Sequence, residues 1–183
     1  ITRGFAQLYE RCLSAYDSIQ DPLGRLRAML QAYVDFGVGE TNVYNLMFTW
    51  SVPKYEDYVG TELEKTANQE LTTALKVSTL FMQAAAHVVN ACEAEAGSDE
   101  TPTIAVDTLR AYVIALWCTL HGYISGCNNT LLNYIHPAPR TLEQPMINLL
   151  IHNIQQMKYE VQTSGASALQ YLSPDNPPAK PPL

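Results

Sequence analysis

The chain has 183 residues, of which 47% are hydrophobic and 16% charged, and its formal net charge is −7. This length is enough for one domain with a sizeable core, and the composition is typical of a soluble globular protein. No run of 18 or more uncharged apolar residues occurs, so we expect no membrane partner. The 11 Lys and Arg residues are scattered, which argues against a nucleic-acid-binding surface in this part of the protein.

Helical periodicity runs through the sequence without strand-like alternation of useful length, so we expect an all-α fold built as a helical bundle. The first helix is expected over residues 1–19. Asp21 is a good N-cap and Pro22 suits the first helical position, so a second helix should begin there and end near residues 37–39. A short aromatic helix is expected over residues 41–50.

The second half of the chain predicts longer helices. Residues 53–96 form either one long helix or two, with Gly60 as a plausible interruption. The next helix is expected over residues 102–130 and the last over residues 142–163. The tail of residues 166–183 is proline-rich and polar, so we expect it to be disordered.

The segment "ALWCTLHGYISG", residues 115–126, has two different apolar faces. At 100° per residue, the small residues Cys118, Gly122 and Gly126 share one stripe, and Trp117 and His121 lie on roughly the opposite side. Either a partner molecule covers one face, or the helix is buried on all sides within a monomer. If close packing explains the glycines, Gly122→Leu should damage packing far more than His121→Phe.

The last helix has more apolar surface than one side can bury. The helix expected over residues 102–130 also has two apolar faces, and the two adjacent helices together predict an intermolecular four-helix bundle. The stripe on the last helix includes Met146, Leu150, Ile154 and Met157.

The segment "VYNLMFTW", residues 43–50, combines aromatic side chains with a methionine. Such density is typical of a core and also suits the adaptable wall of an apolar pocket. His121 has no HxxxH or ExxH partner, so a metal site is not expected; it is either an ordinary core histidine or a polar group in a pocket. No GxSxG, phosphate-binding glycine loop or HExxH motif occurs, and we therefore expect no enzyme activity and no cofactor.

Four cysteines occur, at positions 12, 92, 118 and 127, with no CxxC pair. Their placement in expected helices or at helix ends favours free thiols in a reducing cytoplasm over a disulfide framework.

Two blocks of the sequence resemble the ligand-binding domain of TetR-family transcriptional regulators of the WHG type. They are "RLRAMLQAYVDFGVGETNVYNLMF", residues 25–48, and "LWCTLHGYISG", residues 116–126. The Trp, His and Gly that name the type correspond to Trp117, His121 and Gly122. Thr41 stands where the family often has a proline before the short aromatic helix.

The resemblance implies an N-terminal helix-turn-helix domain that would precede Ile1 and is missing from this chain. Residues 1–19 would then be the linker helix, residues 20–165 the ligand-binding and dimerisation domain, and residues 166–183 the disordered tail. The protein would be a cytoplasmic homodimer that binds operator DNA through the missing domain, and we expect a repressor. A small apolar or aromatic effector would shift the dimer away from the spacing of DNA half-sites.

We expect two sets of functional residues on this basis. The ligand-binding residues are expected to be Tyr33, Phe36, Tyr44, Met47, Phe48, Phe81, Met82, Trp117 and His121. The dimer interface is expected to contain Cys118, Gly122, Gly126, Met146, Leu150, Ile154 and Met157. The alternative is a helical-bundle enzyme or cofactor carrier that uses His121 as an axial ligand or as an acid or base.

Overall fold

The computed structural model describes residues 1–95 and 106–156, except for the side chains of residues 92–95, and this part of the chain contains helices and no strands. The expectation of an all-α bundle is confirmed. The α-helices are α1 (Thr2–Ser18), α2 (Pro22–Gly39), α3 (Thr41–Phe48), α4 (Glu64–Glu95), α5 (Val106–Asn128) and α6 (Glu143–Gln156). Short 3-10 helices are η1 (Tyr55–Tyr58), η2 (Leu131–Tyr134) and η3 (Pro139–Leu142).

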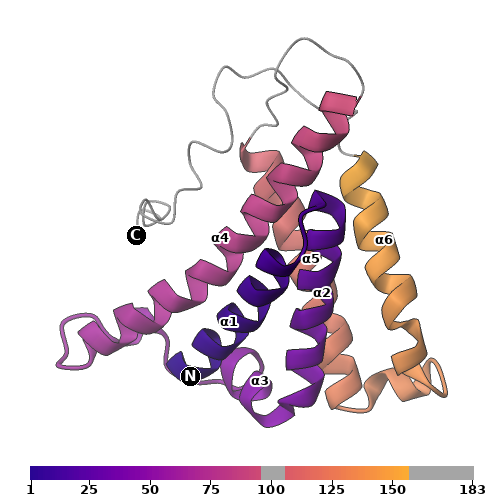
Figure 1. Ribbon diagram of the computed structural model, residues 1–183. Coiled ribbons are helices and arrows are strands. Elements are labelled where there is room, and N and C mark those ends of the chain that lie inside the picture. The colour runs from indigo at the N-terminus through magenta and orange to yellow at the C-terminus, as the bar shows by residue number, and fades with distance from the viewer. Residues whose placement is uncertain (96–105, 157–183) are drawn as a thin grey trace.

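The helices pack around a continuous hydrophobic core (Figure 1). α1 and α2 lie side by side, with α5 behind them and the long α4 slanting across the bundle. α3 lies beside the start of α1, and α6 runs along α2. Leu8, Leu30 and Leu109 are fully buried, so α1, α2 and α5 each contribute to the core.

The junction between α1 and α2 follows the sequence signals. The Asp21 carboxylate accepts a hydrogen bond from the backbone N–H of Gly24 at 2.6 Å, and Pro22 occupies the start of α2. Such a cap satisfies an N–H group that the helix itself leaves unpaired, which is worth about 1 kcal/mol. Thr41 begins α3 directly after α2, so the missing proline does not prevent this helix from forming.

Of the two possibilities left open for the segment that begins at residue 53, the structure has the one with a break near Gly60. Gly60 has φ +79°, a conformation that glycine adopts without the steric cost of a Cβ atom. η1 precedes Gly60 and α4 follows it. The expected end of the last helix at residue 163 and the expected disorder of residues 166–183 lie outside the described residues.

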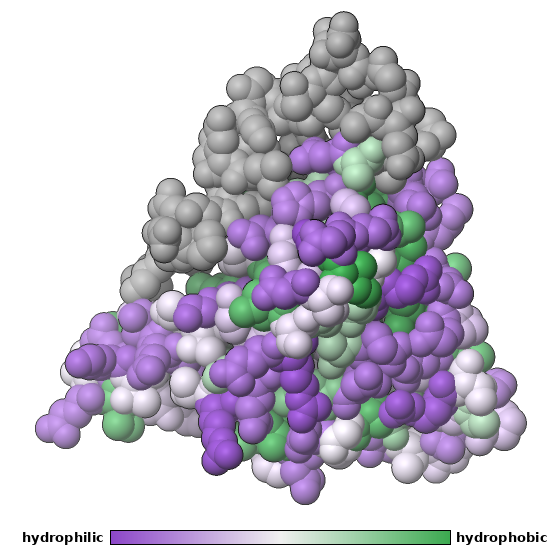
Figure 2. Space-filling model, viewed as in Figure 1, coloured by the Kyte–Doolittle hydropathy of each residue, from purple (hydrophilic) through white to green (hydrophobic). Residues whose placement is uncertain are grey.

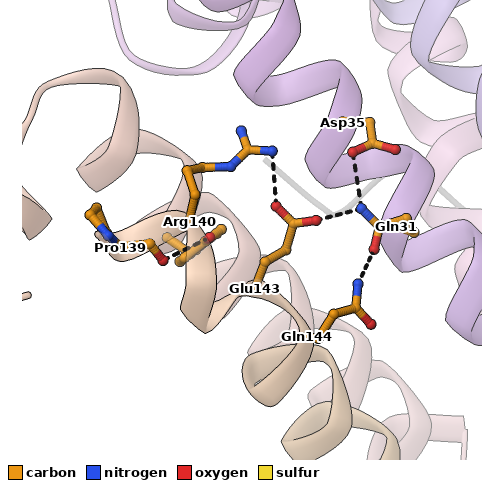
Figure 3. Close-up of polar contacts among 7 residues, drawn as sticks. Gln31, Asp35, Pro139, Arg140, Glu143 and Gln144 are labelled. Atoms are coloured by element: carbon orange, nitrogen blue, oxygen red, sulfur yellow. Dashed lines mark hydrogen bonds and ion pairs between the residues drawn. The ribbon is translucent and has the colours of Figure 1, made fainter. Parts of the chain in front are cut away.

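Polar side chains join α6 to α2 (Figure 3). The Gln31 side-chain amide donates to the Glu143 and Asp35 carboxylates. The Gln144 side-chain amide donates to the side-chain oxygen Oε1 of Gln31. Glu143 is buried, and its second oxygen lies 3.1 Å from the Arg140 guanidinium. The hydrogen bonds of Gln31 with Glu143 and Gln144 join the start of α6 to α2, because they supply the buried Glu143 carboxylate with a polar partner from α2.

Candidate functional site

A cavity of about 290 Å³ lies where five helices meet. This volume is near the lower end of the range typical of small-molecule sites. Its walls come from α1, α2, α3, α4 and α5. The lining residues are Phe5, Leu8, Tyr33, Phe48, Ala74, Leu75, Val77, Ser78, Phe81, Val113, Ile114, Leu116, Trp117 and Leu120.

The cavity extends from the core to the surface. Tyr33 is only 1% exposed, whereas Ile114 is 62% and Trp117 41% exposed. Ser78 is also exposed, and its hydroxyl donates to the Leu75 carbonyl at 2.9 Å. The cavity therefore has a deep end at Tyr33 and an open end between α4 and α5.

Five aromatic rings form part of the cavity wall, in two contacting groups. Tyr33 meets Phe81 edge to face, with ring centroids 5.9 Å apart. Phe48 lies 5.4 Å from Phe5 and 6.1 Å from Trp117. Each pair has the separation of a favourable aromatic contact, so the rings stabilise one another. Their apolar faces also suit an aromatic or aliphatic ligand.

Of the nine expected ligand-binding residues, four line the cavity: Tyr33, Phe48, Phe81 and Trp117. Tyr44 and His121 stand directly behind the wall. The Tyr44 hydroxyl and His121 Nδ1 are 3.1 Å apart, and the His121 ring stacks on Trp117 at 5.2 Å between centroids. Burial lowers the pKa of His121, which favours the neutral imidazole.

The other three expected residues do not line the cavity. Phe36 is buried beneath the Arg11 guanidinium, whose carbon lies 5.3 Å from the ring centroid. Met47 packs against Gly4 of α1, where an added Cβ atom would come within 2.5 Å of its sulfur. Met82 is buried in the core. Each lies on a helix that contributes to the cavity, but its side chain belongs to the surrounding core.

Ten of the lining residues were not predicted from the sequence, and Phe5, Leu8 and Ala74 are examples. The apolar face of α1 was recognised, but nothing in its pattern distinguished a residue beside a cavity from one in a filled core. The side of α4 that faces the cavity is equally difficult to identify, because Ala74 and Ser78 are too small to attract notice in a sequence.

The expected interface residues occupy two different environments. Cys118 and Gly122 are exposed, and an added Cβ atom at Gly122 would meet nothing within 4 Å. Gly126 is buried, and an added Cβ atom there would come within 2.6 Å of the Leu132 side chain. The close-packing explanation is therefore corrected: within the chain it applies to Gly126, whereas the space beside Gly122 is open.

The α6 residues also need correction. Leu150 and Ile154 are buried in the core of their own chain, and Met146 packs against that core. The apolar stripe that we assigned to a partner is thus the face with which α6 covers its own bundle. Met157 lies outside the described residues.

The exposed apolar residues of α5 and α6 lie elsewhere on these helices. On α5, Ile114 and Trp117 lie at the open end of the cavity, and the others form a narrow band of small residues: Ala111, Ala115, Cys118 and Gly122. On and just before α6 the exposed positions have spacings of three and four, starting with Leu142, Pro145 and Leu149. By contrast, the face shown in Figure 2 is covered mainly by hydrophilic side chains.

The described residues also include candidate metal ligands and three cysteines. No group of three His, Cys, Asp or Glu side chains there could hold a metal ion. Cys12, Cys118 and Cys127 are free thiols, and burial raises the pKa of Cys12 to about 12. The Cys92 side chain lies outside the described part. No helix within the described ranges is long and apolar enough to cross a membrane.

The comparisons with known proteins agree with this arrangement. Residues 26–132 match the family described as "Tetracyclin repressor-like, C-terminal domain". Neither the curated proteins nor the solved structures gave a match. The matched region extends from α2 to η2 and so includes four of the five helices that line the cavity. The chain belongs to the tetracycline repressor-like C-terminal domain family.

Proposed function

We propose that the chain is the effector-binding and dimerisation part of a ligand-responsive transcriptional repressor. The observation that carries this proposal is the apolar cavity, because it reaches α1 and α3 as well as the helices of the core. Small-molecule sites are typically concave and mostly apolar with few polar groups, as this one is. The role is regulatory rather than catalytic, and the effector is a small apolar or aromatic molecule.

An effector can act on α1 through direct contacts. Phe5 of α1 lines the cavity and meets Phe48 of α3 edge to face. Behind this pair, α3 packs closely on Gly4 of α1. An effector that binds better to one position of Phe48 shifts the population of α1 positions by its differential affinity for the two states.

The division of the protein follows from this role. Residues 1–19 link the effector domain to an N-terminal DNA-binding domain, residues 20–165 bind the effector and the partner, and residues 166–183 are a tail. A shift of α1 changes the spacing of two DNA-binding domains in a dimer, and that spacing must match successive DNA half-sites. Effector binding then releases operator DNA in the cytoplasm.

The homodimer forms through the exposed bands of α5 and α6 rather than through the buried α6 stripe. Small side chains at Ala111, Ala115 and Cys118 allow a second helix to approach closely. Leu142 and Leu149, which are both exposed, supply apolar area to the same interface.

The test uses the protein with its DNA-binding domain attached. A random pool of duplex DNA is enriched on the protein, and the affinity for the selected DNA is measured with and without a compound that raises the melting temperature of the effector domain. We expect specific DNA binding that weakens at least about fivefold with the compound, the lower end of typical coupling between sites. Specific binding with unchanged affinity would contradict the regulatory role, and no specific DNA binding would contradict the assignment as a DNA-binding regulator.

A further inference from the structure

The deep end of the cavity contains a buried hydroxyl without a partner. Tyr33 lines the cavity and is 1% exposed, and among the described residues no group lies in hydrogen-bonding geometry with its hydroxyl, although the Tyr44 and Trp117 side chains are close enough to shift its pKa. Burial raises its pKa well above the ordinary value, Tyr44 raises it further, and Trp117 lowers it. The hydroxyl is therefore protonated at neutral pH and can donate a hydrogen bond.

The surroundings of this hydroxyl are apolar. Of the 14 lining residues, only Tyr33, Ser78 and Trp117 carry a polar side-chain atom, and Ser78 is at the open end. A water molecule buried in a protein typically makes about three hydrogen bonds, and among the lining residues only Tyr33 presents a buried polar atom without a partner. A ligand atom held in place by apolar contacts is a better partner for the hydroxyl.

The cavity wall also disfavours charged ligands. None of the residues that line the cavity is Lys, Arg, His, Asp or Glu. An ion at the deep end would lose its hydration without gaining a countercharge, and this is costly. The His121 ring stacks on Trp117 and binds Tyr44 through Nδ1, and it does not line the cavity.

We propose that the cavity selects neutral, mainly apolar molecules that carry one hydrogen-bond acceptor, such as a carbonyl or ether oxygen, at the end that meets Tyr33. This inference rests on the proposed function, since it names the chemical class of the effector. The acceptor completes the hydrogen bond that the protein leaves unmade, and the remainder of the molecule fills the aromatic and aliphatic walls. Carboxylates of the same shape are excluded.

Three compounds with a common skeleton test this inference on the 183-residue chain. Diphenylmethane has no acceptor, benzophenone has a carbonyl acceptor, and diphenylacetate has a carboxylate. Equilibrium dialysis measures the affinity of each compound for the wild type and for Tyr33→Phe. Tyr112→Phe is the matched control, because it removes a buried hydroxyl that bonds the Leu150 carbonyl away from the cavity.

We expect the affinity ratio of benzophenone to diphenylmethane to fall about 5- to 10-fold in Tyr33→Phe, as expected for one net hydrogen bond, and to stay unchanged in Tyr112→Phe. Diphenylacetate should bind most weakly to all three proteins. Binding with an unchanged ratio in Tyr33→Phe, or with diphenylacetate equal to benzophenone, would overturn the inference and leave the binding role of the cavity intact. Binding of none of the compounds to the wild type would contradict the binding role itself, and the inference with it.

Discussion

The Tyr44 hydroxyl and His121 Nδ1 lie 3.1 Å apart and join α3 to α5 directly behind the cavity wall. The two rings also stack, with centroids 5.8 Å apart and 27° between their planes. Both side chains contact Phe48, and His121 in addition stacks on Trp117. The pair therefore supports two residues that would contact an effector.

Breaking this pair should weaken the support of the wall. We expect Tyr44→Phe to lower the free energy of unfolding by about 1 kcal/mol, the usual value of a single hydrogen bond. In a double-mutant cycle with His121→Phe, a coupling energy of about 0.5 to 1.5 kcal/mol should appear in urea denaturation. Strict additivity of the two substitutions would show that the hydrogen bond contributes nothing to stability.

The two buried tyrosines that differ in hydrogen bonding should respond in opposite ways to loss of the hydroxyl. Tyr33→Phe removes an unpartnered buried hydroxyl, so we expect the melting temperature to stay the same or rise by a few degrees. Tyr112→Phe removes a hydroxyl that donates to the Leu150 carbonyl at 3.0 Å, so we expect the melting temperature to fall by a few degrees. Differential scanning calorimetry measures both. A clear loss of stability in Tyr33→Phe would indicate that its hydroxyl has a partner in the free protein.

The pH dependence of stability should reflect two partly buried histidines. Burial lowers the pKa of His121 and His87 below 6.5, and Arg25 lowers that of His87 further. The folded chain then binds fewer protons than the unfolded chain as pH falls below 7. Stability from these rings is present above pH 6.5 and is lost as pH falls through the lowered values.

The expected loss from these two rings is below about 1 kcal/mol, because solvent screens partly exposed groups. Urea denaturation at pH 7 and pH 5 measures the difference between the two conditions. His87→Gln combined with His121→Gln should make this difference smaller than in the wild type. An equal or larger difference in the double variant would assign the pH dependence to other groups.

The exposed bands on α5 and α6 predict which substitutions break the dimer. Leu149 is 64% exposed, and Leu149→Arg should place a charge in the interface and shift the chain to a monomer in analytical ultracentrifugation. Leu63 is 56% exposed and lies just before α4, so Leu63→Arg is a matched control that should leave the dimer intact. A Leu149→Arg protein that remains dimeric, or a wild type that is monomeric, would contradict this interface.

Much of the fold could be predicted because its signals are local. The Asp21 cap, Pro22 and Gly60 each determine the backbone within a few residues, and the helices begin and end near them. The aromatic residues of α3 and α5 identified the part of the core that contains the cavity. Periodicity could not distinguish the face of α6 that covers its own bundle from a face for a partner, because both are apolar.

The remainder of the site depends on contacts between distant segments. Glu143 is a buried carboxylate because Gln31, 112 residues earlier in the chain, reaches it. Tyr33 and Tyr44 are both buried tyrosines of the core, yet only Tyr44 has a hydrogen-bond partner among the described residues. No property of either residue's neighbours in the sequence indicates this difference, which decides where a polar ligand atom would bind.

The central claim is that the cavity lined by the five helices α1 to α5 binds the effector. Filling this cavity with a larger side chain tests the claim most directly. Ala74 lines the cavity, and Ala74→Phe would occupy the space with a ring. Thr72→Phe adds the same side chain at an exposed position of α4 that does not line the cavity.

The measurement is equilibrium dialysis of benzophenone against the wild type and both variants, with circular dichroism to verify folding. We predict about one molecule bound per chain in the wild type and in Thr72→Phe, and at least a tenfold loss of affinity in a folded Ala74→Phe protein. Undiminished binding to folded Ala74→Phe would contradict the account, because the ligand would then occupy another part of the protein.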